Sequence, residues 1–487
     1  MNRPLGMTRS AMICFISLSG FTTVQAQITW RRSYGGHGSD AARSVKQTID
    51  GGYVVAGSTG SFGTGGDGYL VKLDELGEVQ WSRYFGGAQV DEFHDVEVLS
   101  DGYLVVGITG SPSNGGYDGL LMRLDASGAL QWRQNYGSME WDFLYSVDAV
   151  EDGYFLSGTT YSDPSLGGEC WILRTDLDGE VLWSTTTGGA DEDEARGVRA
   201  SADGGCVFAG SMGDVNGGSN AFVGKIDPSG GVEWDLSWGT DSVDKAFGLD
   251  IMDDGSIIVG GFTRGFASYQ QLLLAKIDPT GALIWSNNIG QITDWEGHAV
   301  RARPTGGFAM AAFTKAFGFG GKDMYLLLAD SDGQYEFGTT FGGVEDDEAN
   351  ALDLTADGAF VVAGSTDSYG PGTKAMFVVK TGTDGLTESQ DVEEYFDPVG
   401  MDLPVAGRSE SIGPNPVRSN GILKVYNLER QTRPFDFRDE LGRIVGSGFM
   451  GPQGVVQVPS LATGVYWLRL YGLSVQPRVF RIVVLEQ

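Results

Sequence analysis

The sequence has 487 residues and a formal net charge of −31, with 33 basic and 64 acidic side chains. An acidic surplus of this size argues against nucleic acid and anionic membranes as partners, because both are bound by clustered Lys and Arg. The 76 glycines favour short strands joined by tight turns over long helices.

Residues 1–26 have the features of a secretory signal peptide. Arg3 and Arg9 provide the positive start, residues 11–18 form a short apolar run, and Ala26 ends a stretch suited to cleavage. That run is too short to span a bilayer, and no later stretch reaches 18 apolar residues. We therefore expect an exported protein, secreted or attached to the cell surface, with no transmembrane segment in its mature chain.

A phrase of the form Asp-x-x-Gly-x-x-x-Trp repeats along residues 27–385. Its tryptophans recur every 51 residues, and a later copy, longer by one residue, ends in Phe: Trp30, Trp81, Trp132, Trp183, Trp234, Trp285 and Phe337. A period near 50 residues is typical of a repeat array in which each unit packs on its neighbours.

Each period is predicted to contain four strands. In the first period they are expected at 41–48, 53–59, 69–73 and 79–85, with glycines in the intervening turns. The second and third strands are almost continuously apolar, which is typical of a sheet covered on both faces. Four antiparallel strands per repeat predict an all-β fold, a seven-bladed β-propeller over residues 27–385.

The two ends of the array are complementary fragments. Residues 28–36 form a tryptophan-bearing fourth strand with no blade ahead of it, while the last copy stops after Leu386 without such a strand. We therefore expect the N-terminal strand to complete the last blade and remove two open sheet edges.

Residues 386–410 and 411–487 differ from the array in composition. The first segment is acidic, contains Pro398 and Pro404 and lacks apolar periodicity, so it is predicted to be a linker. The second carries nine basic and five acidic residues, and its short strands with Gly and Pro turns suffice for a small β-sandwich.

Ordered motifs run through residues 411–487. They comprise Pro414, Asn415 and Pro416, then Asp439, Gly442 and Arg443, then Leu461, Gly464 and Tyr466, and a final basic-apolar strand at 478–484. Together they resemble the C-terminal sorting domain of type IX secretion cargo, although Arg481 stands where Lys is commoner. The resemblance implies recognition by an outer-membrane secretion machinery and removal of the domain after export. The propeller repeats resemble those of uncharacterised secreted propeller proteins, which implies a fold and no activity.

An acidic residue recurs just before the innermost strand of almost every blade. The series is Asp40, Asp91, Asp142, Asp193, Asp244 and Asp347, with Trp295 at the equivalent position of the sixth blade. Because the residue recurs, we interpret it as an acceptor of backbone N–H groups in the loop between blades. The alternative is a ring of carboxylates at one channel mouth that binds a cation such as Ca²⁺. No other cofactor is expected.

Aromatic residues that break the repeat lie on the same side as these acids: Trp141, Trp238 and Trp295, with Phe143 and Tyr145. Exposed aromatics beside carboxylates would suit stacking on sugar rings or a protein hot spot. The other interpretation is that they pack over blade edges.

The sequence holds few groups suited to catalysis. His37, His94 and His298 share no short metal-ligand spacing, and the first two are predicted to be solvated. The predicted function is therefore a binding or adhesion module for an extracellular polysaccharide or protein. The alternative is an extracellular carbohydrate-active enzyme that uses loop carboxylates. Convergence of unlike polar residues at one end of the channel would favour an enzyme, since turnover needs different groups in different roles.

Overall fold

The computed structural model describes residues 27–396 except 112, 114, 163–166, 190 and 215, and then 411–413, 417–418, 422–426, 433–439, 443–450, 455–470 and 478–485. The expected signal peptide, residues 397–410 of the expected linker, and Pro414, Asn415, Pro416 and Gly442 of the sorting motifs lie outside these residues. The named elements of the described chain are all β-strands. In that part of the chain, no helix has the length and apolar character needed to cross a membrane.

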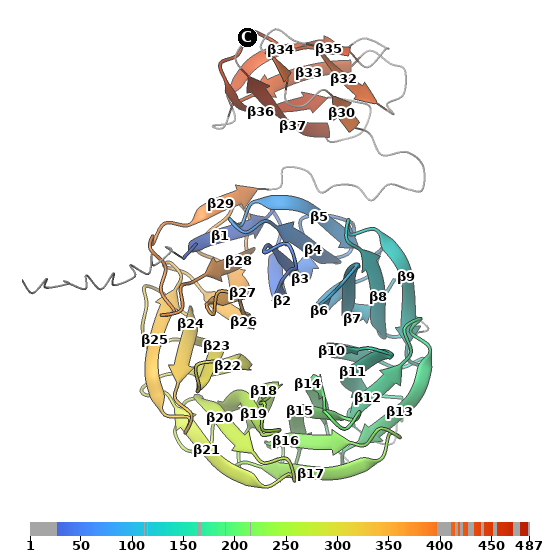
Figure 1. The fold of residues 1–487 in the computed structure, drawn as a ribbon, viewed down its shortest axis with the longest axis vertical. Helices are drawn as coiled ribbons and strands as arrows, with labels where there is room; N and C mark the ends of the chain where they lie inside the picture. The colour runs from blue at the N-terminus through green and yellow to red at the C-terminus, as the bar shows by residue number, and fades with distance from the viewer. Residues whose placement is uncertain are drawn as a thin grey trace, which may run out of the picture.

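Strands β1 to β29 form sheets that follow one another around a ring (Figure 1). In the first sheet β2 (Asp40–Gln47), β3 (Tyr53–Thr59), β4 (Asp67–Leu73) and β5 (Val79–Phe85) lie side by side in chain order. These bounds agree with the expected strands to within two residues. The prediction of an all-β propeller built from sequence repeats is confirmed.

Five further four-stranded sheets repeat this order. They are β6 (Asp91–Leu99), β7 (Gly102–Thr109), β8 (Asp118–Asp125) and β9 (Leu130–Tyr136); β10 (Asp142–Val150), β11 (Gly153–Thr160), β12 (Glu169–Thr175) and β13 (Val181–Thr187); β14 (Glu194–Ala200), β15 (Cys206–Gly213), β16 (Ser219–Ile226) and β17 (Val232–Trp238); β18 (Asp244–Ile251), β19 (Ile257–Thr263), β20 (Gln271–Ile277) and β21 (Leu283–Ile289); and β22 (Trp295–Ala302), β23 (Phe308–Thr314), β24 (Asp323–Ala329) and β25 (Tyr335–Phe341).

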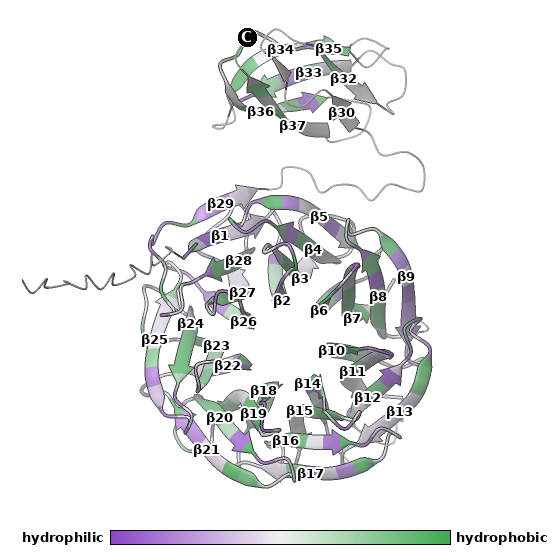
Figure 2. Cartoon of the chain, in the orientation of Figure 1, coloured by the Kyte–Doolittle hydropathy of each residue, from purple (hydrophilic) through white to green (hydrophobic). Residues whose placement is uncertain are grey.

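The second and third strands of each sheet carry the core. Every residue of β7 and β11 is buried, and Figure 2 shows hydrophobic stretches along the strands between the inner and outer rims. One core cluster joins Val54 and Leu70 of the first sheet to Phe93 and Val105 of the next. Apolar side chains on both faces of a sheet therefore bind it to two neighbours, as a ring requires.

The last sheet closes the ring with the N-terminal strand, as expected. It contains β26 (Asp347–Leu354), β27 (Phe360–Thr366), β28 (Ala375–Lys380), β1 (Trp30–Gly35) and β29 (Glu393–Phe396), in that order. Strand β1 pairs antiparallel with β28, from Trp30 opposite Lys380 to Tyr34 opposite Met376. Strand β29, expected to belong to a linker, instead pairs parallel with β1, and Arg32 bonds Glu393 at 2.6 Å. The open edge of β1 provides the backbone groups for this fifth strand.

The repeated phrase is a contact between adjacent sheets. In its first copy Asp74 Oδ1 accepts the N–H groups of Leu76 at 2.9 Å and Glu78 at 2.8 Å, which closes the turn. Gly77 in that turn has a φ of +80°, and the ring of Trp30 lies against its Cα. The same contact recurs around the ring, as Trp81 on Gly128 and Trp132 on Gly179. The glycine therefore serves both the turn and the neighbouring tryptophan.

The described residues from 411 onward form two sheets. One contains β30 (Ser411–Gly413), β32 (Ile422–Tyr426) and β35 (Val455–Gln457); the other contains β31 (Val417–Arg418), β37 (Arg478–Leu485), β36 (Gly464–Leu470), β33 (Arg433–Arg438) and β34 (Ile444–Met450). Leu423 and Val456 of the first sheet share one buried cluster with Phe437, Leu468 and Ile482 of the second. This part of the chain has a hydrophobic core of its own.

A pair of glycines tests the contact between sheets. A Cβ at Gly128 (φ +77°) would lie 2.9 Å from the Trp81 ring, whereas one at Gly51 (φ +83°) would meet no atom within 4 Å. Both alanine substitutions should cost about 1–2 kcal/mol through positive φ. We expect Gly128→Ala to cost a further ~1–3 kcal/mol by displacing Trp81, measured by urea unfolding. Equal losses in the two variants would show that the Trp-Gly contact contributes nothing.

Candidate functional site: the central cavity

Each innermost strand contains a β-bulge at the same point. In β2 the ladder skips one residue between Ala42 and Ser44, and β6, β10, β14, β18, β22 and β26 each skip one at the equivalent place. A bulge leaves one residue unpaired and re-aims its side chain. The bulged residues all line a cavity at the centre of the ring: Arg43, His94, Tyr145, Arg196, Phe247, His298 and Asn350.

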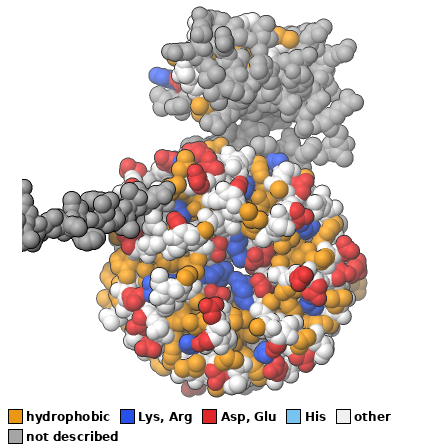
Figure 3. Space-filling model, viewed as in Figure 1, with side chains coloured by type: hydrophobic (Ala, Val, Ile, Leu, Met, Phe, Trp, Pro, Cys, Tyr) orange, Lys and Arg blue, Asp and Glu red, His pale blue; other side chains and the backbone are white. Residues whose placement is uncertain are grey.

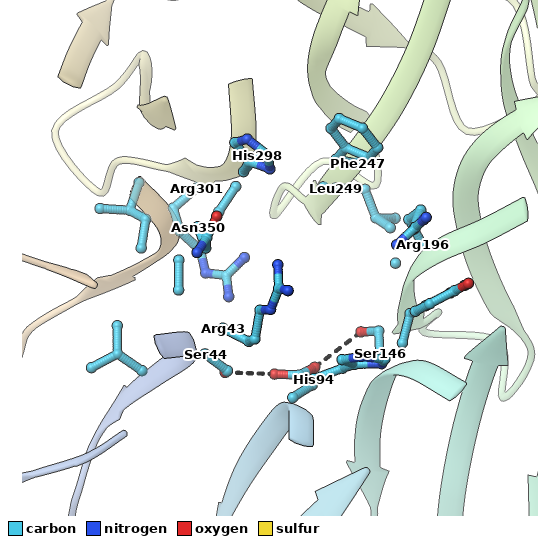
Figure 4. A pocket seen from close by; sticks show the side chains of 18 of the residues that line it. Arg43, Ser44, His94, Ser146, Arg196, Phe247, Leu249, His298, Arg301 and Asn350 are labelled. Atoms are coloured by element: carbon cyan, nitrogen blue, oxygen red, sulfur yellow. Dashed lines mark hydrogen bonds between the residues drawn. The ribbon is translucent and has the colours of Figure 1, made fainter. Parts of the chain in front are cut away.

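The cavity has a volume of about 120 Å³ and is lined only by the innermost strands (Figure 4). A single water needs roughly 10–15 Å³ on the same measure, so the space exceeds one ordered solvent molecule several-fold. The seven bulged residues are of five types, two arginines, two histidines, a tyrosine, a phenylalanine and an asparagine, whereas the tryptophans, turn glycines and loop aspartates are repeated. Residues of different types cannot all make the same structural hydrogen bond in every sheet. The site is therefore asymmetric in a quasi-symmetric ring.

Five consecutive bulged side chains stack on one another around the cavity. The His94 and Tyr145 rings lie 5.3 Å apart, and the Arg196 guanidinium lies 4.0 Å above the Tyr145 ring and 5.9 Å from that of Phe247. Phe247 in turn stacks on His298 at 5.3 Å with an interplanar angle of 4°. Cation–π and ring stacking thus fix these side chains before any ligand arrives.

Arg43 and Asn350 complete the circle without joining this stacked arc. The Asn350 Nδ2 atom donates to the backbone oxygen of Ala42 at 2.8 Å, which orients its amide. The Arg43 side chain remains 45% exposed and extends toward the middle of the cavity (Figure 4). Arg43 is therefore the lining side chain placed to meet a ligand first.

The cavity is basic although the chain is acidic. Figure 3 shows Lys and Arg side chains gathered at the ring's centre, and the lining includes Arg43, Arg196, Arg199 and Arg301. Asp95 is the one carboxylate among the lining residues. It accepts hydrogen bonds from Ser44 Oγ at 2.7 Å, Ser146 Oγ at 3.0 Å and Val147 N at 3.2 Å. Its charge is thus engaged in joining three neighbouring inner strands.

Carboxylates near the cavity lie at different distances from the lining arginines and therefore offset their positive charges unequally. Arg196 Nε bonds Glu194 at 2.6 Å. Burial lowers the pKa of Arg199, but nearby carboxylates, Asp148 first, more than offset this and raise it. Arg43 lies 3.9 Å from Glu92, whose pKa is lowered chiefly by its hydrogen bond with His94. The ion-pair contact of Arg43 is therefore longer than that of Arg196, and Glu92 also interacts with His94.

Of the two histidines predicted to be solvated, His37 is exposed as expected and His94 is not. His94, expected to be solvated, lies on β6 with a side chain only 15% exposed; its Nδ1 is 2.7 Å from the Leu144 oxygen. Burial lowers the pKa of His298 to about 4, so this imidazole is neutral at pH 7. The signal that could have identified both is a comparison of the repeats by position. At the position three residues after the repeated aspartate, each repeat has a different residue from the repeats before and after it in the chain.

The repeated aspartates are buried hydrogen-bond acceptors and do not line the cavity. Asp40, Asp91, Asp142, Asp193, Asp244 and Asp347 are each at most 2% exposed. Asp40 Oδ2 accepts from Gly36 N at 2.8 Å and from Ser61 Oγ at 2.6 Å, and Asp347 Oδ2 accepts from Gly343 N at 2.8 Å. This confirms their interpretation as acceptors in the loops between sheets. Among the described residues, no three His, Cys, Asp or Glu side chains gather as a metal site requires.

Three of the five predicted aromatic residues lie together, and the other two lie apart from them. The Trp141 and Phe143 rings are 6.2 Å apart, and Phe143 stacks at 6.2 Å on Tyr145, which lines the central cavity. Trp141 is 55% exposed and meets Tyr117 edge-on at 6.1 Å. Trp295 is only 4% exposed and packs 5.1 Å from Tyr325, as the blade-edge interpretation expects, and Trp238 is half-buried. None of the three tryptophans lines the central cavity. Trp141 is therefore an exposed aromatic at the end of a row of rings that reaches the cavity at Tyr145.

The described sorting-motif residues make local contacts. Asp439 accepts from Arg443 N at 2.9 Å and from Arg443 Nε at 2.7 Å, and Tyr466 donates to the Ala462 oxygen at 3.1 Å. Gly464 begins β36. These contacts shape turns and a strand end.

Comparison with known proteins gives distant similarities. No family model matches the chain. Regulatory protein FlaEY of Caulobacter vibrioides is 26% identical over 272 residues, 48% of this chain and 27% of that protein, so the chain spans about a quarter of that relative's length.

Solved structures are similar at low sequence identity. The Pan2 WD40 domain of Neurospora crassa has a TM-score of 0.48 and 11% identity, covering 76% of this chain and 99% of that one. Sqt1 from Chaetomium thermophilum has a TM-score of 0.43 and 13% identity, covering 75% and 86%. A thermostable family-43 glycoside hydrolase has a TM-score of 0.31 and 13% identity, covering 50% and 93%. None of these similarities assigns a ligand to the cavity.

The depressed pKa of His298 predicts how stability depends on pH. Between pH 6.5, the ordinary pKa of histidine, and about pH 4, His298 is protonated in the unfolded chain but neutral in the folded chain. Acidification over this range therefore favours unfolding. The stabilising contribution of neutral His298 is complete above 6.5 and is lost as pH falls to about 4. We expect native protein to lose more stability over this window than His298→Gln, measured by denaturant unfolding at each pH. Parallel curves would contradict the assignment.

Proposed function

We propose that this chain is an extracellular or cell-surface binding module, a seven-bladed β-propeller that holds a polysaccharide or protein ligand at its central cavity. The observation that carries the proposal is the set of unlike bulged residues around the cavity. Each bulge removes one residue from the hydrogen-bonded ladder and turns its side chain toward the cavity, although the packing of the ring does not require it. Bulges of this kind occur beside functional sites.

Delivery through a type IX secretion machinery is the second part of the proposal. In this scheme residues 1–26 direct export, 386–410 connect the domains, and 411–487 form a β-sandwich read by the outer-membrane machinery. The motif residues from Pro414 to Tyr466 support it, together with the separate buried core of this segment. The mature chain is then released or retained at the cell surface.

An extracellular carbohydrate-active enzyme is the second candidate, favoured by two neighbouring inner-strand carboxylates. Burial raises the pKa of Glu296. Burial also acts to raise that of Glu348, but the ion pair with Lys322 outweighs it and lowers the pKa. Carboxyl groups whose pKa values are driven apart suit the acid and base roles of glycoside hydrolysis. Both residues lie on inner strands, not in the loops where the sequence suggested such groups.

A glycan array probed with the full chain and two tryptophan variants tests the binding site. Asn350→Trp fills the cavity from β26, whereas Leu182→Trp alters an exposed position of outer strand β13. We expect the first variant to lose at least roughly tenfold in affinity for any glycan that native protein binds, and the second to bind normally. Equal binding by both variants would place the site outside the cavity. Release of new sugar ends by native protein but not Glu296→Gln would establish the enzyme instead.

A further inference from the structure

Among the arginines of the central cavity, Arg43 combines a long ion-pair contact, 3.9 Å from Glu92, with a side chain that is 45% exposed. The chain as a whole has a charge of −31, yet the lining has four arginines against one aspartate, Asp95, which accepts hydrogen bonds from Ser44, Ser146 and Val147. We propose that the cavity binds the carboxylate of an acidic sugar, with the Arg43 guanidinium as its partner. The proposal rests on the proposed binding function and names its ligand class.

The lining arginines differ in how closely the carboxylates of the fold approach them. Arg196 is engaged by Glu194 at 2.6 Å, and Arg301 lies 3.8 Å from Asp353. Arg199 lies among several carboxylates. Arg43 extends toward the middle of the cavity (Figure 4), and its nearest acid, Glu92 at 3.9 Å, also lies 3.6 Å from His94. An exposed guanidinium with one long, shared ion-pair contact suits a ligand that brings a carboxylate of its own.

The guanidinium geometry suits a carboxylate. Arginine presents parallel N–H groups that match the two oxygens of a carboxylate, and such charge-assisted pairs are stronger than neutral hydrogen bonds. The exposure of Arg43 leaves its N–H groups accessible from the cavity. Lysine at this position would supply the charge without the paired donors.

Neutral polar groups around Arg43 indicate that the ligand carries hydroxyls as well as the charge. The His298 Nε2 atom is buried and makes no hydrogen bond to the described residues. The Asn350 amide lines the same space. A neutral imidazole and an amide beside one cation fit a polyhydroxylated acid, such as a uronic acid residue of a glycan, better than a simple inorganic anion.

Calorimetric titration of the full chain provides the test. The ligands are D-galacturonate, D-glucuronate and D-mannuronate, each compared with its neutral parent sugar, and then inorganic sulfate and phosphate. Each acid differs from its parent only in carrying a carboxylate at C6. The variants are Arg43→Gln, Arg43→Lys and the control Arg133→Gln, which removes the same charge from outer strand β9. Thermal melts of all variants confirm that they are folded.

We expect at least one uronate to bind native protein and Arg133→Gln equally, and its neutral parent to bind neither measurably. Arg43→Gln should bind that uronate at least roughly tenfold more weakly, the loss expected for a charged hydrogen-bond pair, and Arg43→Lys should fall between the two. That pattern supports the proposal, because it shows that binding depends on the carboxylate of the ligand and not on the sugar ring alone.

Other outcomes overturn the proposal in distinguishable ways. Equal binding of the acid and its neutral parent, abolished by Asn350→Trp, would keep the cavity as the binding site but refute an anionic ligand. Sulfate or phosphate binding as tightly as every uronate would make the cavity a general anion site and refute the sugar acid. If native protein binds no uronate and the array shows binding to neutral glycans or to none, the acidic-sugar ligand is refuted. If the array shows no binding at all, glycan binding as the proposed function is refuted as well.

Discussion

The contact between a tryptophan and the turn glycine of the next sheet is the constraint on which the rest of the structure depends. The aspartate of the phrase closes the turn with its own carboxylate, the glycine adopts positive φ, and the missing Cβ leaves room for the neighbouring ring. One short phrase thereby specifies both a hairpin turn and the distance to the adjacent sheet. Because each sheet repeats it, the sheets are held at similar spacing around the axis.

Regular spacing on the outside permits irregular chemistry at the centre. The two middle strands of each sheet carry most of the buried apolar side chains, while outer strands such as β13 are largely exposed. Each innermost strand adds only a few core residues, such as Phe93 and Val96 of β6 and Leu144 and Val147 of β10, and its other side chains are not needed for the core. The bulge in each inner strand then turns one residue toward the cavity without altering the sheets behind it. The ring can thus change its central residues one at a time, and the residues found there include cations, imidazoles, aromatic rings and an amide.

Much of the fold could be predicted from the sequence because it depends on repetition. The tryptophan period located the strands, and the incomplete copies at the two ends predicted the pairing of β1 with β28. The role of Asp40 and its equivalents as buried acceptors also followed from their recurrence. Strand β29 could not be predicted, since its acidic sequence resembles a linker and only the open edge of β1 makes it a strand.

The site was harder to predict, because a bulge leaves no mark in the spacing of the repeats. Simple alternation along β2 does not require Arg43 to face the channel, and the burial of both Ser44 and Val45 shows where the register slips. The sequence-based search for residues that break the repeat found Tyr145, which lines the cavity, but it otherwise pointed to Phe143 and three tryptophans that do not. Trp295 illustrates the difference: it replaces a repeated aspartate, yet it packs against Tyr325 in the core.

A crystal structure of the full chain grown with an excess of the best-binding uronate tests the central claim most directly. The account predicts difference density for one sugar in the cavity, with its carboxylate within about 3 Å of the Arg43 guanidinium and a hydroxyl at hydrogen-bonding distance from His298 Nε2. Density for the sugar at Trp141 or elsewhere on the loops, with only ordered water between the bulged residues, would contradict it.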